Sequence, residues 1–98
     1  MKNRKLVTII TESILESMLV KDIEQLGATG YTIKEARGQG TRGLRSADWD
    51  QNRNIQIEVI CDEGVASAII DHCQKEYYSN YAMVLYISEV QVLRPEKF

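Results

Sequence analysis

The hydrophobic residues of this chain repeat at two different periods, and the order of those periods is the strongest constraint on its fold. Residues 54–61 alternate between polar and apolar side chains, which is the period of a half-buried β-strand. Three further segments have the β-branched and apolar character of strands: residues 5–11, 31–36 and 81–93. We therefore expect four β-strands.

Two segments between these strands have helical spacing instead. The first helix is expected to end near Leu26, followed by Gly27 and Gly30 as terminating glycines, and Ser13 with Glu16 matches a capping box at its start. Its apolar stripe consists of Leu15, Leu19, Ile23 and Leu26, widened by Ile14 and Met18. The second helix, over about residues 65–78, has a stripe of Val65, Ile69, Cys73 and Tyr77, joined by Ala66 and Ile70.

The order strand, helix, strand, strand, helix, strand predicts a ferredoxin-like βαββαβ fold of the α+β class. Its four strands form one antiparallel sheet, and both helices cover one face of that sheet. The chain has 98 residues without a linker or a low-complexity segment, so we expect a single domain over residues 1–98. The last strand is apolar on both faces. This favours another subunit covering the open face, although a central strand with an imperfect pattern gives the same sequence.

The connection between the second and third strands is long for this fold. It runs for about 17 residues, from Arg37 to Arg53, whereas hairpin loops are typically 2–5 residues. Such long loops are usually functional or disordered. Four arginines and two aspartates give this loop a charge of +2, whereas the eight basic and twelve acidic residues elsewhere give −4. Positive charge is therefore concentrated in the loop.

The same loop contains the residue types that bind phosphate. Gly38 and Gly40 allow backbone N–H groups to approach an anion closely. Arg42 and Arg45 supply charged guanidinium forks, and Thr41 adds a hydroxyl donor. The alternative is a solvated loop whose arginines pair with nearby carboxylates. The residues alone leave both interpretations open.

Trp49, the only tryptophan, lies in this loop between two aspartates. It either anchors a protein partner or folds back onto its own domain.

Composition and residue spacing argue against several other functions. The net charge of −2 disfavours nucleic-acid binding, and the longest uncharged apolar run, residues 81–87, is far too short to span a bilayer, so we expect a cytoplasmic protein. Cys61 and Cys73 form no C-x-x-C motif and are expected to be buried thiols. His72 and Cys73 point in different directions on a helix and predict no metal site. No nucleophile motif or catalytic base is apparent, so we expect no enzymatic activity.

Three segments carry a family resemblance: Gly-Ala-Thr-Gly-Tyr-Thr-Ile at 27–33, Gly-Gln-Gly-Thr-Arg-Gly-Leu-Arg-Ser at 38–46, and Tyr-Tyr-Ser-Asn-Tyr-Ala-Met-Val-Leu-Tyr-Ile at 77–87. With the βαββαβ order and the long loop, they resemble the PII signalling superfamily, most closely its SbtB-type regulators of cyanobacterial bicarbonate transport. The resemblance implies a homotrimer that binds adenine nucleotides (cyclic AMP, AMP, ADP, ATP) as ligands, not as cofactors, in clefts between subunits. It also implies that the loop at about 37–53 is a flexible T-loop. That loop would regulate a membrane transporter of the bicarbonate type.

The resemblance further implies roles for individual residues. The nucleotide phosphate would be held by Gly40, Thr41, Arg42 and Arg45. The nucleotide cleft would include Asn80, Tyr81, Ala82 and Met83, the last at a position where similar regulators often carry Gly. The partner-binding loop would include Arg37, Gly38, Leu44, Trp49 and Arg53.

A second functional hypothesis keeps the trimer without a small ligand. The protein would then be an interaction or scaffold protein that binds a partner directly through Trp49 and the loop arginines. Only the first hypothesis predicts saturable nucleotide binding that is lost on replacement of Arg42 or Arg45.

Overall fold

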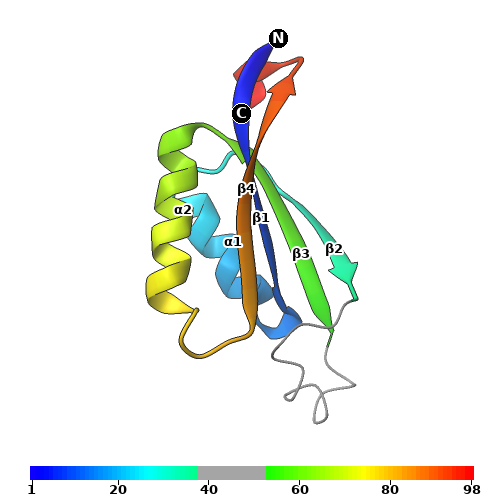
Figure 1. The fold of residues 1–98 in the computed structure, drawn as a ribbon, viewed down its shortest axis with the longest axis vertical. Helices are drawn as coiled ribbons and strands as arrows, with labels where there is room; N and C mark the ends of the chain where they lie inside the picture. Colours follow the sequence, from blue (N-terminus) through cyan, green and yellow to red (C-terminus); the bar gives the residue numbers. More distant parts are fainter. Residues whose placement is uncertain (38–52) are drawn as a thin grey trace.

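The computed structural model describes residues 1–37 and 53–98, which form one sheet with two helices on one of its faces (Figure 1). In chain order the elements are β1 (Lys2–Glu12), the 3₁₀ turn η1 (Ser13–Leu15), α1 (Glu16–Gln25), β2 (Thr32–Ala36), β3 (Asn54–Cys61), α2 (Glu63–Glu76), β4 (Met83–Val92) and the 3₁₀ turn η3 (Pro95–Lys97). The predicted ferredoxin-like βαββαβ fold is confirmed. None of the helices in these two ranges is long and apolar enough to cross a membrane.

The sheet has the strand order β2-β3-β1-β4, and every neighbouring pair is antiparallel. β1 lies between β3 and β4: it pairs with β3 from Lys5 to Glu12 and with β4 from Lys2 to Thr11. Ala36 pairs with Asn54, so β2 ends and β3 begins at the same end of the sheet. Both chain termini lie at the opposite end (Figure 1).

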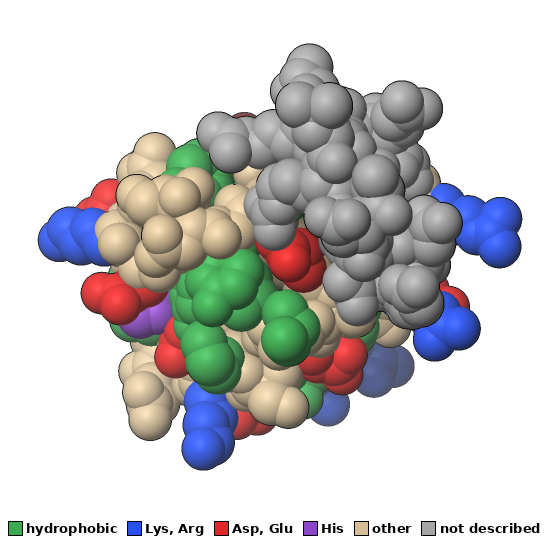
Figure 2. All heavy atoms as spheres, turned by 90° about the horizontal axis from the view of Figure 1, so that it is seen from below, with side chains coloured by type: hydrophobic (Ala, Val, Ile, Leu, Met, Phe, Trp, Pro, Cys, Tyr) green, Lys and Arg blue, Asp and Glu red, His purple; other side chains and the backbone are tan. Residues whose placement is uncertain are grey.

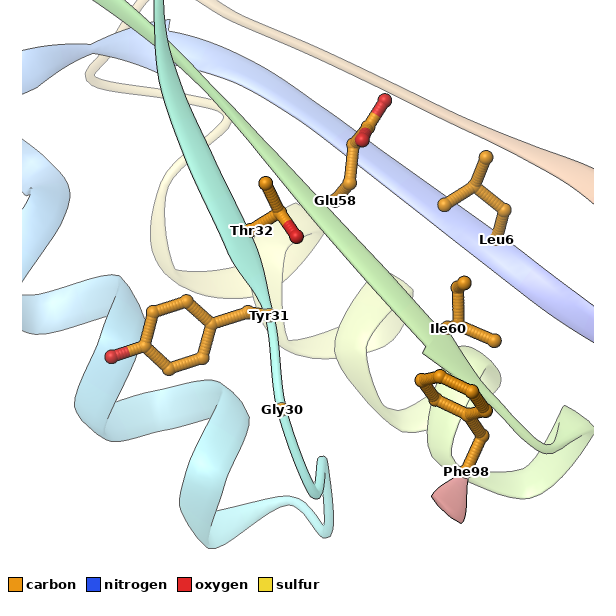
Figure 3. A pocket seen from close by; sticks show the side chains of 7 residues that line it. All are labelled: Leu6, Gly30, Tyr31, Thr32, Glu58, Ile60 and Phe98. Carbon is orange, nitrogen blue, oxygen red and sulfur yellow. The ribbon is translucent and has the colours of Figure 1, made fainter. Parts of the chain in front are cut away.

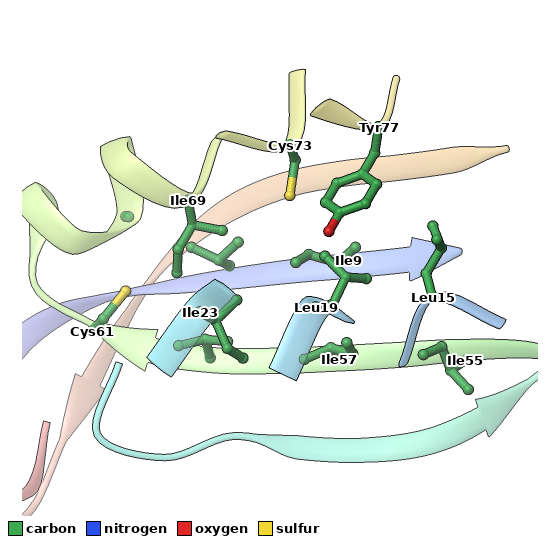
Figure 4. Close-up of a cluster of buried hydrophobic side chains, with 13 residues drawn as sticks. Ile9, Leu15, Leu19, Ile23, Ile55, Ile57, Cys61, Ile69, Cys73 and Tyr77 are labelled. Carbon is green, nitrogen blue, oxygen red and sulfur yellow. The ribbon is translucent and has the colours of Figure 1, made fainter. Parts of the chain in front are cut away.

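The core lies between the sheet and the two helices (Figure 4). The apolar faces of the strands and the apolar stripes of the helices form this core, as the sequence predicts. Its buried residues are Val7, Ile9, Leu15, Leu19, Ile23, Ile55, Ile57, Val59, Cys61, Ala66, Ile69, Cys73 and Tyr77. The expectation that Ile14 and Met18 widen the stripe of α1 is wrong. Their side chains are 77% and 48% exposed, because they face away from the sheet at the start of the helix.

The two helices begin differently. Asp62 caps α2 by accepting a hydrogen bond from the Val65 N–H at 2.8 Å. The capping box predicted for Ser13 and Glu16 is wrong, because Ser13 belongs to the 3₁₀ turn and no side chain caps either η1 or α1. At the end of α1, Gly27 has φ +115°, a conformation that glycine adopts without strain, as predicted for a terminating glycine.

The face of the sheet opposite the helices is uncovered in a single chain. Met83 and Leu85 of β4 pack against the core, whereas Val84 and Tyr86 point the other way and are 56% and 49% exposed. The two-sided apolar character predicted for this strand is therefore real. We call the uncovered side the open face of the sheet.

Candidate functional site

Most of the predicted loop residues lie outside the described part of the chain. These are Gly38, Gly40, Thr41, Arg42, Leu44, Arg45 and Trp49. Arg37 and Arg53, at the two ends of the loop, are described and exposed. They follow and precede the paired residues Ala36 and Asn54, so the two ends of the loop leave the sheet from neighbouring strands. The Arg53 carbonyl also accepts a hydrogen bond from the Ser13 N–H at 2.8 Å.

The predicted cleft residues, which we call the cleft turn, are Asn80, Tyr81 and Ala82 between α2 and β4 and Met83, the first residue of β4. The backbone of Asn80, Tyr81 and Ala82 is held by hydrogen bonds. The N–H groups of Asn80 and Tyr81 donate to the Tyr77 carbonyl at 3.1 and 3.0 Å. The Ala82 N–H donates to a Glu12 carboxylate oxygen at 2.8 Å, and the Ala82 carbonyl accepts from the Thr11 hydroxyl at 2.7 Å. The last two residues of β1 thus fix both polar groups of Ala82.

This turn lies at the same end of the sheet as the loop ends. Thr11 pairs with both Ile55 and Met83, and the next residue, Glu12, pairs with Asn54. Figure 2 looks onto this end and shows hydrophobic side chains gathered at its centre with acidic side chains around them. The structure therefore brings together two of the predicted sets, the ends of the loop and the cleft turn.

Three polar side chains join α1 to α2 next to the cleft turn. His72 Nε2 lies 2.8 Å from Asp22 Oδ2, and the Tyr77 hydroxyl donates to the same oxygen. Burial and this hydrogen bond raise the pKa of the Tyr77 phenol above its ordinary value. The Tyr77 ring also meets the Tyr81 ring edge to face, with centroids 6.1 Å apart. These contacts fix the end of α2 from which the cleft turn starts.

A hollow of about 190 Å³ lies on the open face, near the ends of β2 and β3 that are remote from the loop (Figure 3). It is lined by Leu6, Gly30, Tyr31, Thr32, Glu58, Ile60 and Phe98. Its walls combine apolar side chains with two polar groups, the Thr32 hydroxyl and the Glu58 carboxylate. Figure 3 shows the Tyr31 ring pointing away from the hollow, so Tyr31 lines it mainly through its backbone. An open hollow with mixed polar and apolar walls suits contact with part of a small, partly polar ligand.

Sequence reasoning missed this hollow. Leu6 and Ile60 pair directly in the sheet and are apolar residues on the open face of β1 and β3, which was the available signal. Phe98 joins them only because η3 folds back over the sheet. That juxtaposition is tertiary, so no spacing in the sequence predicts it.

The hollow and the cleft turn are well separated within one chain. Leu6 lines the hollow, whereas Thr11 holds Ala82. Leu6 and Thr11 are five positions apart on an extended strand, which corresponds to roughly 17 Å. One chain therefore presents two separate candidate regions along its sheet.

The remaining reactive side chains offer little chemistry. Cys61 and Cys73 are buried and free, as predicted. Burial raises the pKa of Cys61 to about 11 and that of Cys73 to about 12, so both thiols stay protonated near neutral pH. Within residues 1–37 and 53–98, no cluster of three His, Cys, Asp or Glu side chains could hold a metal ion.

Comparison with known proteins adds a family assignment. A family profile described as "Nitrogen regulatory protein P-II" matches residues 4–97. A PII-like signalling protein from Thermus thermophilus is 49% identical, with 98% of this chain and 95% of that one covered and a TM-score of 0.84.

Two further structures share the fold at lower identity. The PII-like protein CPII of Thiomonas intermedia, bound to ADP, AMP and bicarbonate, is 23% identical over 99% of this chain and 94% of that one, with a TM-score of 0.85. The GlnK–ATP complex of B. subtilis is 15% identical over 98% of both chains, with a TM-score of 0.71.

Proposed function

The chain belongs to the nitrogen regulatory protein P-II family, and on that premise we propose that it is a homotrimeric sensor of adenine nucleotides. The nucleotides would bind in clefts between subunits. The observation that carries this proposal is the hollow on the open face, whose walls and polar groups suit a nucleobase. Structures of CPII with ADP and AMP, and of GlnK with ATP, support the choice of adenine nucleotides.

A cleft between subunits accounts for the separation of the two candidate regions. The hollow and the cleft turn are roughly 17 Å apart along β1 in one chain. A second subunit packed on the open face could place its own cleft turn and loop ends beside the hollow of the first. The exposed Val84 and Tyr86 on that face provide apolar surface for such packing.

Within this cleft we assign the phosphate to the arginine-rich loop. Gly40, Thr41, Arg42 and Arg45 would contact it, because glycine backbone and arginine forks suit an anion. The cleft turn of Asn80, Tyr81, Ala82 and Met83 would border the same site. The Ala82 N–H already donates to the Glu12 carboxylate, so Glu12 would have to release it before that N–H could bind a phosphate.

We further propose that the loop transmits the identity of the nucleotide to a membrane transporter of the bicarbonate type, from the cytoplasmic side. Arg37, Gly38, Leu44, Trp49 and Arg53 would form the partner-binding surface. A nucleotide whose phosphate pairs with Arg42 and Arg45 would stabilise one loop conformation over another. Each charge-assisted contact contributes about 1.5–3 kcal/mol, so two contacts suffice to shift the populations by tenfold or more.

The test is a calorimetric titration of the purified protein with cyclic AMP, AMP, ADP and ATP. We expect saturable binding near one site per chain, and a loss of at least about tenfold in affinity for Arg45→Ala. Lys21→Ala, an exposed substitution on α1, is the control and should bind as the unaltered protein does. Absence of binding heat with all four nucleotides would exclude adenine-nucleotide sensing.

A scaffold function without a nucleotide is the second candidate. The observation that favours it is the exposed pair Ile14 and Met18, which lies at the start of α1 close to the Arg53 end of the loop. Exposed apolar side chains beside a long loop suit contact with a protein partner. The same titration separates the two functions, because a scaffold gives no saturable nucleotide binding.

A further inference from the structure

The Phe98 side chain forms one wall of the hollow, although the residue lies beyond the last strand. Figure 3 shows its ring beside Ile60, on the open face of the sheet. The residue is 38% exposed, so the ring is neither packed into the core nor free in solvent. A half-exposed aromatic ring at the edge of a hollow is available to stack on a flat ligand.

Hydrogen bonds to two separate elements hold the turn that carries this ring. The Thr29 hydroxyl, from the connection before β2, donates to the Lys97 carbonyl at 2.9 Å. The Arg4 guanidinium, from β1, donates to the Pro95 carbonyl at 3.2 Å. Within η3, the Phe98 N–H donates to the Pro95 carbonyl at 3.1 Å. The ring is therefore positioned by contacts outside its own turn.

We propose that Phe98 stacks on the base of the bound nucleotide and determines its selectivity, with Thr29 as the residue that positions Phe98. This inference rests on the proposed nucleotide-binding function and deepens it. Alanine substitution of a stacking aromatic typically weakens binding by about fivefold to a hundredfold per base. A purine offers a larger face than a pyrimidine to the ring and to Ile60, so the hollow favours purine nucleotides.

The test compares Phe98→Leu with Phe98→Tyr, which keeps the ring, using AMP, UMP and the fluorescent probe 2-aminopurine riboside 5′-monophosphate. We expect Phe98→Leu to weaken AMP binding by at least about fivefold, to reduce the preference for AMP over UMP, and to lose the stacking quench of the probe. Phe98→Tyr retains all three properties. Leu93→Ala, at an 82% exposed side chain outside the lining of the hollow, is the matched surface control.

Thr29 is tested with Thr29→Val, which removes the hydroxyl, and Thr29→Ser, which keeps it. We expect Thr29→Val to weaken AMP binding, although less than Phe98→Leu does, and to reduce the probe quench. Thr29→Ser, which keeps the hydroxyl, should retain the AMP affinity and the quench of the unaltered protein. A purely structural role would lower the thermal midpoint without changing the ratio of AMP to UMP affinity.

The outcomes separate this inference from the proposed function. If the unaltered protein binds none of the nucleotides, both are overturned. If it binds AMP and Phe98→Leu binds AMP equally well, the stacking role is wrong. If Phe98→Leu loses AMP and UMP affinity by the same factor, the role in selectivity is wrong. The sensor function stands in both cases.

Discussion

At the scale of single residues, we expect the two buried thiols to make the free energy of unfolding decrease as the pH rises into the alkaline range. Their folded pKa values of about 11 for Cys61 and about 12 for Cys73 lie above the unfolded value of 9.0. Above pH 9 the unfolded chain loses thiol protons that the folded chain retains, so stability falls as pH rises. We expect the free energy of unfolding to fall by up to about 1.4 kcal/mol per pH unit for each thiol between its unfolded and folded pKa.

Cys73→Ala provides the control for this prediction. Urea unfolding of this variant between about pH 8.5 and 10 should show a shallower decline in the free energy of unfolding than the unaltered protein shows. The range stops there because the Tyr77 phenol, whose pKa is also raised by burial, adds a loss of the same sign at higher pH. Identical slopes for the two proteins would show that Cys73 does not titrate on unfolding.

Residue patterns predicted burial well where the period was regular. The alternation of residues 54–61 placed Ile55, Ile57, Val59 and Cys61 in the core without error. The error at Ile14 and Met18 has a geometric cause. Each precedes a buried residue, Leu15 or Leu19, by one position, which is about 100° around a helix. The buried stripe continues from Leu15 and Leu19 toward Ile23, in the opposite direction, so the sheet does not cover Ile14 and Met18.

At the scale of elements, the start of α2 depends on one capping residue. Asp62→Ala removes the acceptor for the Val65 N–H, and we expect it to lower the free energy of unfolding by about 1 kcal/mol. Asp62→Asn keeps a capping oxygen and should cost much less. Ser13→Ala should change stability little, because no side chain caps η1 or α1. Chemical denaturation of the three variants measures this, and an equal cost at Ser13 and Asp62 would contradict it.

Element order was predictable from sequence, whereas the candidate site was only partly so. Each strand and helix carries its own period, so the βαββαβ order follows from local patterns. The cleft turn was found only through family resemblance, and its fixation by Thr11 and Glu12 requires the tertiary contact between β1 and the start of β4. The hollow also requires η3 to fold onto the sheet, which no local period encodes.

At the scale of the whole molecule, the open face of the sheet must be covered if the nucleotide cleft lies between subunits. Val84→Glu places a charge on that face, where Val84 is 56% exposed in a single chain. Burying an unpaired charge costs several kcal/mol, so we expect the variant to remain folded but sediment as a monomer while the unaltered protein sediments as a trimer.

The same variant links assembly to binding. Because the hollow and the cleft turn are roughly 17 Å apart within one chain, a monomer cannot bring both to one nucleotide, and Val84→Glu should lose most of its AMP affinity. Lys21→Glu introduces the same side chain at an exposed position on α1, away from the open face, and should leave both sedimentation and AMP binding unchanged. If the Val84→Glu variant is monomeric and still binds AMP with full affinity, the whole nucleotide site lies within one subunit. If the unaltered protein sediments as a monomer, the proposed trimer is wrong.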